Sequence, residues 1–393
     1  MIIYNKEWVH NMRIVDGLKD KLREGSITPE EFIAVKTVHP FYFYLPRLVI
    51  RVGLFILTFI IASFATGLLS LLGLSTHMID SPGWPIFLGA VCYGALEFFV
   101  KENRFFHSGV DNALLYYSAC LFGGGFIWMI SKMYLTVGDN LPCAIIICLL
   151  CIYLTLRFAD VLTTLVACIA FFAVVYFTWA KAGSFGLATM PFMMMIAAGM
   201  AFYLINKLGK DIRSINYESC IDYAKIISLI ALYAAGNYFV VNRLNNMLNN
   251  LDDSHTSIPL GFIFWIWTML VPVAYTLLGI RKKSAMFLRL GMVLAAASIA
   301  TFRNYYHLLP IEAMLTLSGM ILLAASYTII KYLKTPHNGI TYAEPEERSD
   351  FDKLNIEALI VGQATSHLPT PAQHPTDRFG GGTGGGGGSS GKF

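Results

Sequence analysis

Four ionisable residues near predicted membrane boundaries have side chains of the types that bind ions or move protons. Glu97 stands within the apolar run 94–100, and an ionised group costs roughly 2.5–3.5 kcal/mol or more at the centre of a bilayer. Arg303, His307 and Glu312 follow one another closely. An Arg, a His that titrates near neutral pH and a carboxylate could together bind an anionic headgroup or relay protons. Glu97, near the inner end of the second predicted span, and the outer group Arg303, His307 and Glu312 are therefore two separate sets of candidate binding residues.

Each candidate also has a simpler structural interpretation. The sequence leaves the functional and the structural interpretation open in each case. Glu97 is followed by Lys101 and Arg104, so an ion pair at the membrane surface would explain it. Tyrosines follow Arg303, and such residues are typical of the aromatic belt where a helix leaves the bilayer.

Other patterns point away from metal, cofactor and enzyme chemistry. Cys148 and Cys151 form a CxxC inside an apolar run with no second pair and no nearby His, which favours packing over metal binding. The Asn- and Asp-rich stretch 245–255 lacks the ligand spacing of a calcium loop. The chain has no Walker A sequence, and no predicted span holds an HExxH or GxSxG motif. We therefore predict no cofactor, no metal site and, on balance, no enzymatic activity.

The elements that must position these residues are ten apolar stretches, each near the ~20 residues needed to cross a hydrocarbon core of ~30 Å. The predicted spans are 48–74, 84–100, 112–131, 141–157, 161–180, 186–206, 222–242, 258–280, 285–302 and 310–333. Hydrophobic residues make up 56% of the chain and charged residues only 14%. The alternating pattern of a barrel is absent, and helices satisfy their own backbone polar groups in lipid. The predicted fold is an all-α polytopic bundle.

Positive charge sets the predicted orientation. Lys132, Lys181, Arg243 and Arg303 are the only cations in the loops on one side of the bundle, and the other side is rich in Lys and Arg. Cytoplasmic loops carry such an excess, so we predict that both termini are cytoplasmic and that the protein is a multi-pass protein of the cytoplasmic (inner) membrane. The first 40 residues lack the apolar core of a cleavable signal.

The chain divides into three predicted regions: 1–46, 47–333 and 334–393. The first reads as a cytoplasmic helical hairpin, because Gly25 ends one helix and Thr28, Pro29 and Glu31 give the capping signal of a second. The second region holds the ten spans. The third is rich in Pro and polar residues and ends in a Gly-rich run, a composition typical of disordered tails.

Two resemblances accompany this organisation. The GxITxEEF pattern of residues 25–32 resembles short helical hairpins of the SHOCT type, which implies contacts with a partner or a second copy. Residues 1–46, the Arg-Val-Gly at 51–53, residues 304–310 and the Gly-rich end make the chain similar to multispan membrane proteins of the Bacteroidetes, in the style of the bacterial DUF2157-type families. This second likeness implies a multispan architecture and no particular mechanism.

Three functions stay open on the sequence. The favoured one is a carrier or permease for a small solute, since ten spans divide into two five-helix halves that would be inverted repeats. The alternative is a scaffold or sensor that contacts a partner, or itself, through residues 1–46 and the tail. The third is a lipid-modifying enzyme whose site would be the outer mouth formed by Arg303, His307 and Glu312. The predicted partners are the lipid bilayer and such a protein, with no nucleic acid.

The topology prediction is directly testable with reporter fusions. Fusions after residues 78, 137, 183, 250 and 305 should report the outer side, and fusions after 105, 210, 283 and 340 the cytoplasmic side, because the positive loops are retained inside. Two reversed signals would contradict the assignment.

Overall fold

The protein was analysed as a computed structural model, which describes residues 2–23, 26–74, 77–133, 140–249 and 260–305 together with isolated residues between 316 and 331. Within these ranges the named elements are helices. The predicted all-α fold is confirmed. The predicted tail, 334–393, lies outside the described residues.

The described part of the chain contains nine helices that are long and apolar enough to cross a membrane, as expected of an integral membrane protein. They are α3 (Leu48–Leu74), α4 (Gly83–Glu102), α5 (Val110–Met133), α6 (Leu141–Phe158), α7 (Val161–Ala180), α8 (Gly183–Leu208), α9 (Glu218–Gly236, with Ser214–Tyr217 preceding it in the span), α11 (Gly261–Lys282) and α12 (Ala285–Tyr305). The tenth predicted span, 310–333, falls outside the described residues except at single positions. The count of ten therefore stays a prediction.

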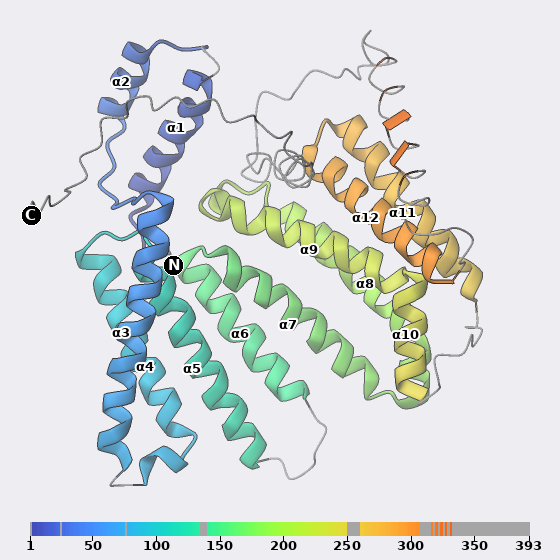
Figure 1. Ribbon diagram of the computed structural model, residues 1–393, viewed down its shortest axis with the longest axis horizontal. Coiled ribbons are helices and arrows are strands. Elements are labelled where there is room, and N and C mark those ends of the chain that lie inside the picture. Colours follow the sequence, from blue (N-terminus) through green and yellow to red (C-terminus); the bar gives the residue numbers. More distant parts are fainter. Residues whose placement is uncertain are drawn as a thin grey trace, which may run out of the picture. The chain divides into compact units, whose positions relative to one another are not determined.

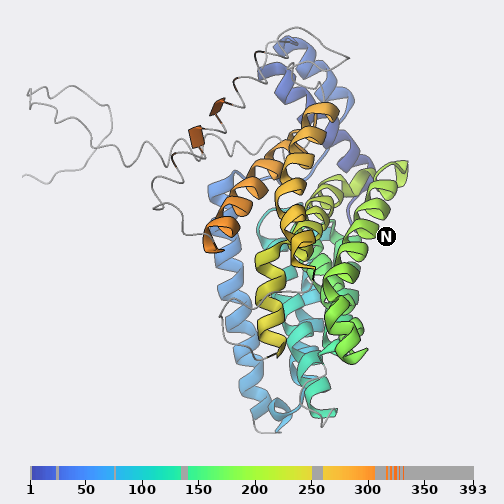
Figure 2. The same ribbon diagram turned by 90° about the vertical axis from the view of Figure 1, so that its right-hand side faces the viewer.

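The spans pack mostly against their neighbours in the chain. Successive helices from α4 to α9 contact one another, α3 lies against α5, and α7 also touches α9. Helices α11 and α12 form a pair that contacts α9, and Figures 1 and 2 both show the two side by side. Two separate clusters of buried apolar side chains result. One lies among α4, α5 and α6 and includes Leu96, Leu115 and Phe158, and the other lies among α9, α11 and α12.

Glycine permits the closest approaches between helices. A Cβ atom added at Gly125 of α5 would lie 2.6 Å from Ile86 of α4, and one at Gly291 of α12 would lie 2.5 Å from Thr276 of α11. Small residues at such positions let helix backbones approach in lipid. The sequence indicated close packing or local flexibility over 123–125, but a Cβ at Gly123 or Gly124 would meet nothing within 4 Å. The packing role belongs to Gly125 alone.

The N-terminal region contains α1 (Lys6–Arg23) and α2 (Pro29–Val38). The capping box predicted for the second helix is present: Glu31 N–H donates to the Thr28 hydroxyl at 3.3 Å, and the Thr28 backbone N–H donates to Glu31 Oε2 at 2.8 Å. That backbone hydrogen bond favours the ionised form and lowers the pKa of Glu31.

The seventh predicted span, 222–242, is wrong as one continuous helix. Helix α9 ends at Gly236, Asn237 is extended (φ −71°, ψ 127°), and a new helix, α10 (Tyr238–Asn249), begins. Figure 1 shows α10 turning away from the direction of α9. Hydropathy runs on past Asn237 into Tyr, Phe and Val, so an apolar window cannot detect the break.

The close contact at Gly291 generates a stability prediction. Gly291→Ala should destabilise the protein by about 1–3 kcal/mol, because its Cβ would lie 2.8 Å from the backbone nitrogen of Thr276. Gly199→Ala is the matched control: a Cβ there meets nothing within 4 Å, so helix propensity should leave stability unchanged or slightly higher. Thermal unfolding in detergent measures both, and equal midpoints would contradict the packing role.

Candidate functional site

Glu97 is held in an ion pair that joins α4 to α6. Its Oε1 accepts hydrogen bonds from Arg157 Nε (3.0 Å) and Nη2 (2.9 Å) and from the Tyr93 hydroxyl (2.7 Å), and its Oε2 accepts one from Lys101 Nζ (3.1 Å). Tyr93, Glu97 and Lys101 are four residues apart and share one helix face. The sequence indicated Lys101 or Arg104 as the partner of Glu97. Lys101 is confirmed, and the second partner is Arg157, sixty residues away in the chain.

Two further carboxylates, which the sequence did not reveal as site residues, lie at the same ends of α4 and α6 as Glu97 and Arg157. Each of them closes a turn between helices. Asp160, only 3% exposed, is the N-cap of α7 and accepts hydrogen bonds from Thr163 N–H and the Tyr116 hydroxyl, both at 2.9 Å. Asp111, 2% exposed, accepts from the backbone N–H groups of His107 (2.7 Å) and Ser108 (2.8 Å). The signal available in the sequence was local: an Asp between two spans with Thr three residues on is a capping pattern.

The N-terminal segment lies over these turns. Tyr4, 6% exposed, contacts Phe106, with the ring centroids 4.7 Å apart. Burial raises the pKa of the Tyr4 phenol well above its ordinary value, and the carboxylates of Asp111 and Asp160 raise it further. Ile3 N–H donates to the Arg157 carbonyl at 3.0 Å. The segment therefore touches both the α4–α5 loop and the α6–α7 turn.

Helix α1 continues the same contacts. Arg104, which the sequence associated with Glu97, instead lies over the Trp8 ring with its guanidinium carbon 5.1 Å from the ring centroid. Val9 and Val15 are buried at 3% and 1% exposure. Further along α1, Arg13 Nη1 lies 3.7 Å from Glu218 Oε2, at the start of α9. Residues 2–23 thus contact three inter-helix turns.

A second polar centre surrounds the break between α9 and α10. Asn237, 3% exposed, uses its Oδ1 to accept hydrogen bonds from the N–H groups of Phe239 (3.0 Å) and Val240 (3.3 Å). Its Nδ2 donates to the Tyr233 hydroxyl (3.0 Å) and to Thr301 Oγ1 (3.2 Å). One amide therefore caps α10 and ties it to α9 and α12. The adjacent Gly-Asn pair was the sequence signal for this stop.

The network extends to α11 through a proline. Pro272 has no N–H, so the carbonyl of Thr268, four residues earlier, loses its helical partner. The Ser298 hydroxyl of α12 donates to this Thr268 carbonyl at 2.5 Å in place of the missing N–H. The Tyr233 hydroxyl lies 2.9 Å from the same Ser298 oxygen. Thr268 Oγ1 accepts from Tyr238 N–H, the first of α10, at 2.9 Å. Tyr233, Asn237, Thr268, Ser298 and Thr301 are called the break network below.

Two buried polar atoms near the break network have no hydrogen-bond partner among the described residues: Asn242 Oδ1 and the indole Nε1 of Trp267, which packs against Gly236. Asn242 is 6% exposed, its Nδ2 donates to the Tyr305 hydroxyl at 2.8 Å, and its Oδ1 is buried without a hydrogen bond. Turning the amide by 180° would exchange the two atoms and still leave one unpaired. The Tyr305 ring packs edge-on against Tyr238 (4.9 Å) and Trp265 (5.7 Å), so aromatic surface adjoins the amide.

Of the four candidate residues, the structure describes Glu97 and Arg303, which belong to different helices. The hydrogen-bond partners of Glu97 belong to α4 and α6. Arg303 lies at the end of α12, with its Nη1 buried and unpaired. His307 and Glu312 lie outside the described residues. The mouth formed by Arg303, His307 and Glu312 stays a prediction.

Comparison of the chain with protein-family models, with curated proteins and with solved structures gives no match. The resemblance to Bacteroidetes multispan proteins and to SHOCT-type hairpins therefore stays a prediction.

The geometry of Glu97 predicts unequal coupling to its two cations. In double-mutant cycles with Glu97→Gln, Arg157→Gln should show a coupling of about 1.5–3 kcal/mol, because two hydrogen bonds to a charged group are lost in a partly buried site. Lys101→Gln should show roughly 0.3–0.5 kcal/mol, because its side chain is 58% exposed. Chemical unfolding in detergent measures both. Equal couplings would show that Arg157 is not the structural partner.

Proposed function

We propose that the protein is a carrier for a small, uncharged polar solute, which binds beside the break between α9 and α10. The observation that carries the proposal is the buried, unpaired oxygen of Asn242 next to the break network. A buried acceptor without a partner costs about 1–3 kcal/mol. A solute that donates a hydrogen bond to it would remove that cost.

The broken helix supports the same function. Carriers commonly bind their substrates where a membrane helix is interrupted, because irregular backbone supplies polar groups inside an apolar bundle. Here the backbone donors at the start of α10 are already occupied by Asn237 and Thr268, so the break offers no free helix terminus to an anion. The binding groups that remain are amides, hydroxyls and aromatic faces, which suit an uncharged solute.

The ion pair at Glu97 does not support a proton pathway in this conformation. A proton carrier needs a carboxylate that can gain and lose its proton, whereas Glu97 accepts hydrogen bonds from Arg157, Lys101 and Tyr93 together. This arrangement supports an anchoring role for Glu97. We further propose the cytoplasmic membrane and cytoplasmic termini, on the strength of the distribution of Lys and Arg.

A second function, a scaffold that binds a partner, is favoured by one observation. Helix α2 has no buried residue, and its Ile33 and Val38 are 60% and 72% exposed. Apolar side chains on a helix outside the membrane-spanning region are a candidate contact for a partner. If the carrier experiment below is negative, this face becomes the best-supported functional feature.

The carrier proposal is tested by solute flux into proteoliposomes. Vesicles holding the full chain should equilibrate at least one of urea, glycerol and glucose faster than protein-free vesicles, as followed by light scattering after an osmotic step. Asn242→Leu should reduce that rate about tenfold, because the side chain keeps its bulk and loses both polar atoms. Asn245→Leu, the same change on the same helix at a site less buried than Asn242, is the control.

Two results would contradict the proposal. If all three solutes entered at the same rates as in protein-free vesicles, the protein would not be a carrier for this class of solute. Equal loss in both Asn variants would place the effect in the folding of α10 instead of at the binding group.

A further inference from the structure

The N-terminal segment lies across three turns at one end of the bundle. Residues 2–15, called the strap below, contact the α4–α5 loop through Tyr4 and Trp8. Ile3 N–H donates to the Arg157 carbonyl at the α6–α7 turn, and α1 also contacts the segment that joins α8 to α9. Figure 1 shows α1 at the end of the bundle where these turns lie. The strap therefore bridges three consecutive pairs of helices.

The first two of these turns contain residues in the left-handed backbone conformation. Arg104 (φ 54°) and His107 (φ 47°) belong to the α4–α5 loop, and Ala159 (φ 50°) ends α6. None of the three is a glycine, so each carries a steric cost between its Cβ atom and its own backbone. Such conformations persist only where the surrounding structure holds them, and they are typical of segments that switch between two states.

The strap contacts both strained residues of the loop. The guanidinium carbon of Arg104 lies 5.1 Å from the centroid of the Trp8 ring, and the ring centroids of His107 and Tyr4 are 6.2 Å apart. Within the loop itself, Asp111 accepts a hydrogen bond from the His107 N–H at 2.7 Å. Support for the strained conformation therefore comes from inside the loop and from the strap together.

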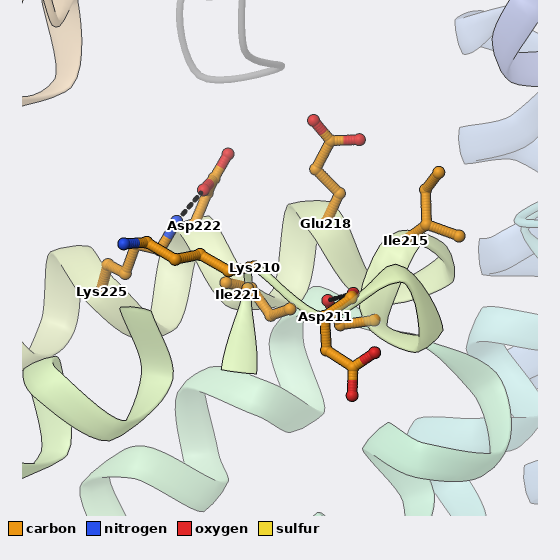
Figure 3. A pocket seen from close by; sticks show the side chains of 9 residues that line it. Lys210, Asp211, Ile215, Glu218, Ile221, Asp222 and Lys225 are labelled. Carbon is orange, nitrogen blue, oxygen red and sulfur yellow. Dashed lines mark hydrogen bonds and ion pairs between the residues drawn. The ribbon is translucent and has the colours of Figure 1, made fainter. Parts of the chain in front are cut away.

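The far end of α1 lies beside a pocket at the junction of α8 and α9. The pocket has a volume of about 530 Å³ and is lined by the end of α8, the short 3-10 helix η2 (Ile212–Tyr217) and the first turns of α9 (Figure 3). In Figure 3 the side chain of Glu218 points away from that of Asp211, and Arg13 Nη1 approaches Glu218 Oε2 at 3.7 Å. Because side chains do not fill this junction, the start of α9 has room to shift.

We propose that the strap is a releasable device that holds this end of the bundle closed. When the strap is seated, it keeps the α4–α5 loop and the α6–α7 turn together in strained conformations. When it leaves, both turns relax and the helix ends that they join are free to move apart. Strain in the turns opposes the contacts of the strap, so this end of the bundle has two states. The device is independent of the solute site beside Asn242.

Hydrogen exchange of the full chain in detergent, read by mass spectrometry, tests the proposal. In the native chain the protection factors of residues 2–15, 103–109 and 157–160 should agree within about threefold, because one opening event exposes all three segments. Tyr4→Ala/Trp8→Ala should raise exchange in both turns about tenfold, because the aromatic contacts of the strap are lost. His10→Ala removes an exposed ring from α1 and should change none of the three segments.

Two variants of His107 separate strain from packing. His107→Ala and His107→Gly both remove the ring, but only glycine adopts a positive φ without a steric cost. The loop should therefore be about fivefold better protected in His107→Gly than in His107→Ala. This comparison does not require the double aromatic variant to fold.

Three results would overturn the proposal. Equal protection of the loop in the two His107 variants would show that the seated loop stores no strain. Unchanged exchange of both turns in Tyr4→Ala/Trp8→Ala would show that the strap does not hold them. Protection factors of the strap and the two turns that differ more than tenfold in the native chain would show that the segments open separately.

Discussion

A backbone N–H or C=O group that faces hydrocarbon without a partner costs several kcal/mol, and this constraint governs where the chain can turn. Each interruption discussed above is closed by one polar side chain. Asp111 closes the α4–α5 loop, Asp160 caps the two-residue turn into α7, and Asn237 caps α10. Ser298 supplies the donor that Pro272 cannot. Asp160, Asn237 and Ser298 also form hydrogen bonds with other helices, so the residues that close these interruptions also fix the packing around them.

Hydropathy predicted nearly all of the fold because the cost of exposing polar backbone to lipid acts on every residue of a span. The capping box at Thr28 was also predictable, since it depends on residues three apart. Contacts between helices that are distant in the sequence were not predictable in this way. Nothing local relates Glu97 to Arg157, and the pairing exists only because α4 and α6 place their ends together. Asn237 was missed because apolar residues continue on both sides of it, which hides the break from any windowed average.

The two polar centres differ in how completely their groups are paired, and this difference bears on function. The carboxylates of Glu97, Asp111 and Asp160 each accept at least two hydrogen bonds, as expected of groups that hold a structure together. The break network is also paired internally, but Asn242 beside it keeps one unpaired atom. A site that must bind and release a solute needs such a group, because a fully satisfied network has nothing to exchange.

The N-terminal segment spans several of the turns between helices. Its contacts run from the α4–α5 loop and the α6–α7 turn to Glu218, which Arg13 approaches at 3.7 Å. Glu218 is 63% exposed and also lines the pocket at the junction of α8 and α9, so one carboxylate borders both α1 and that pocket. Arg13 Nη1 is buried and has no hydrogen-bond partner among the described residues, and Glu218 is the carboxylate that lies near it. The pair is long and Glu218 is mostly exposed, so the buried side chains of Val9 and Val15 contribute more than this pair to the packing of α1.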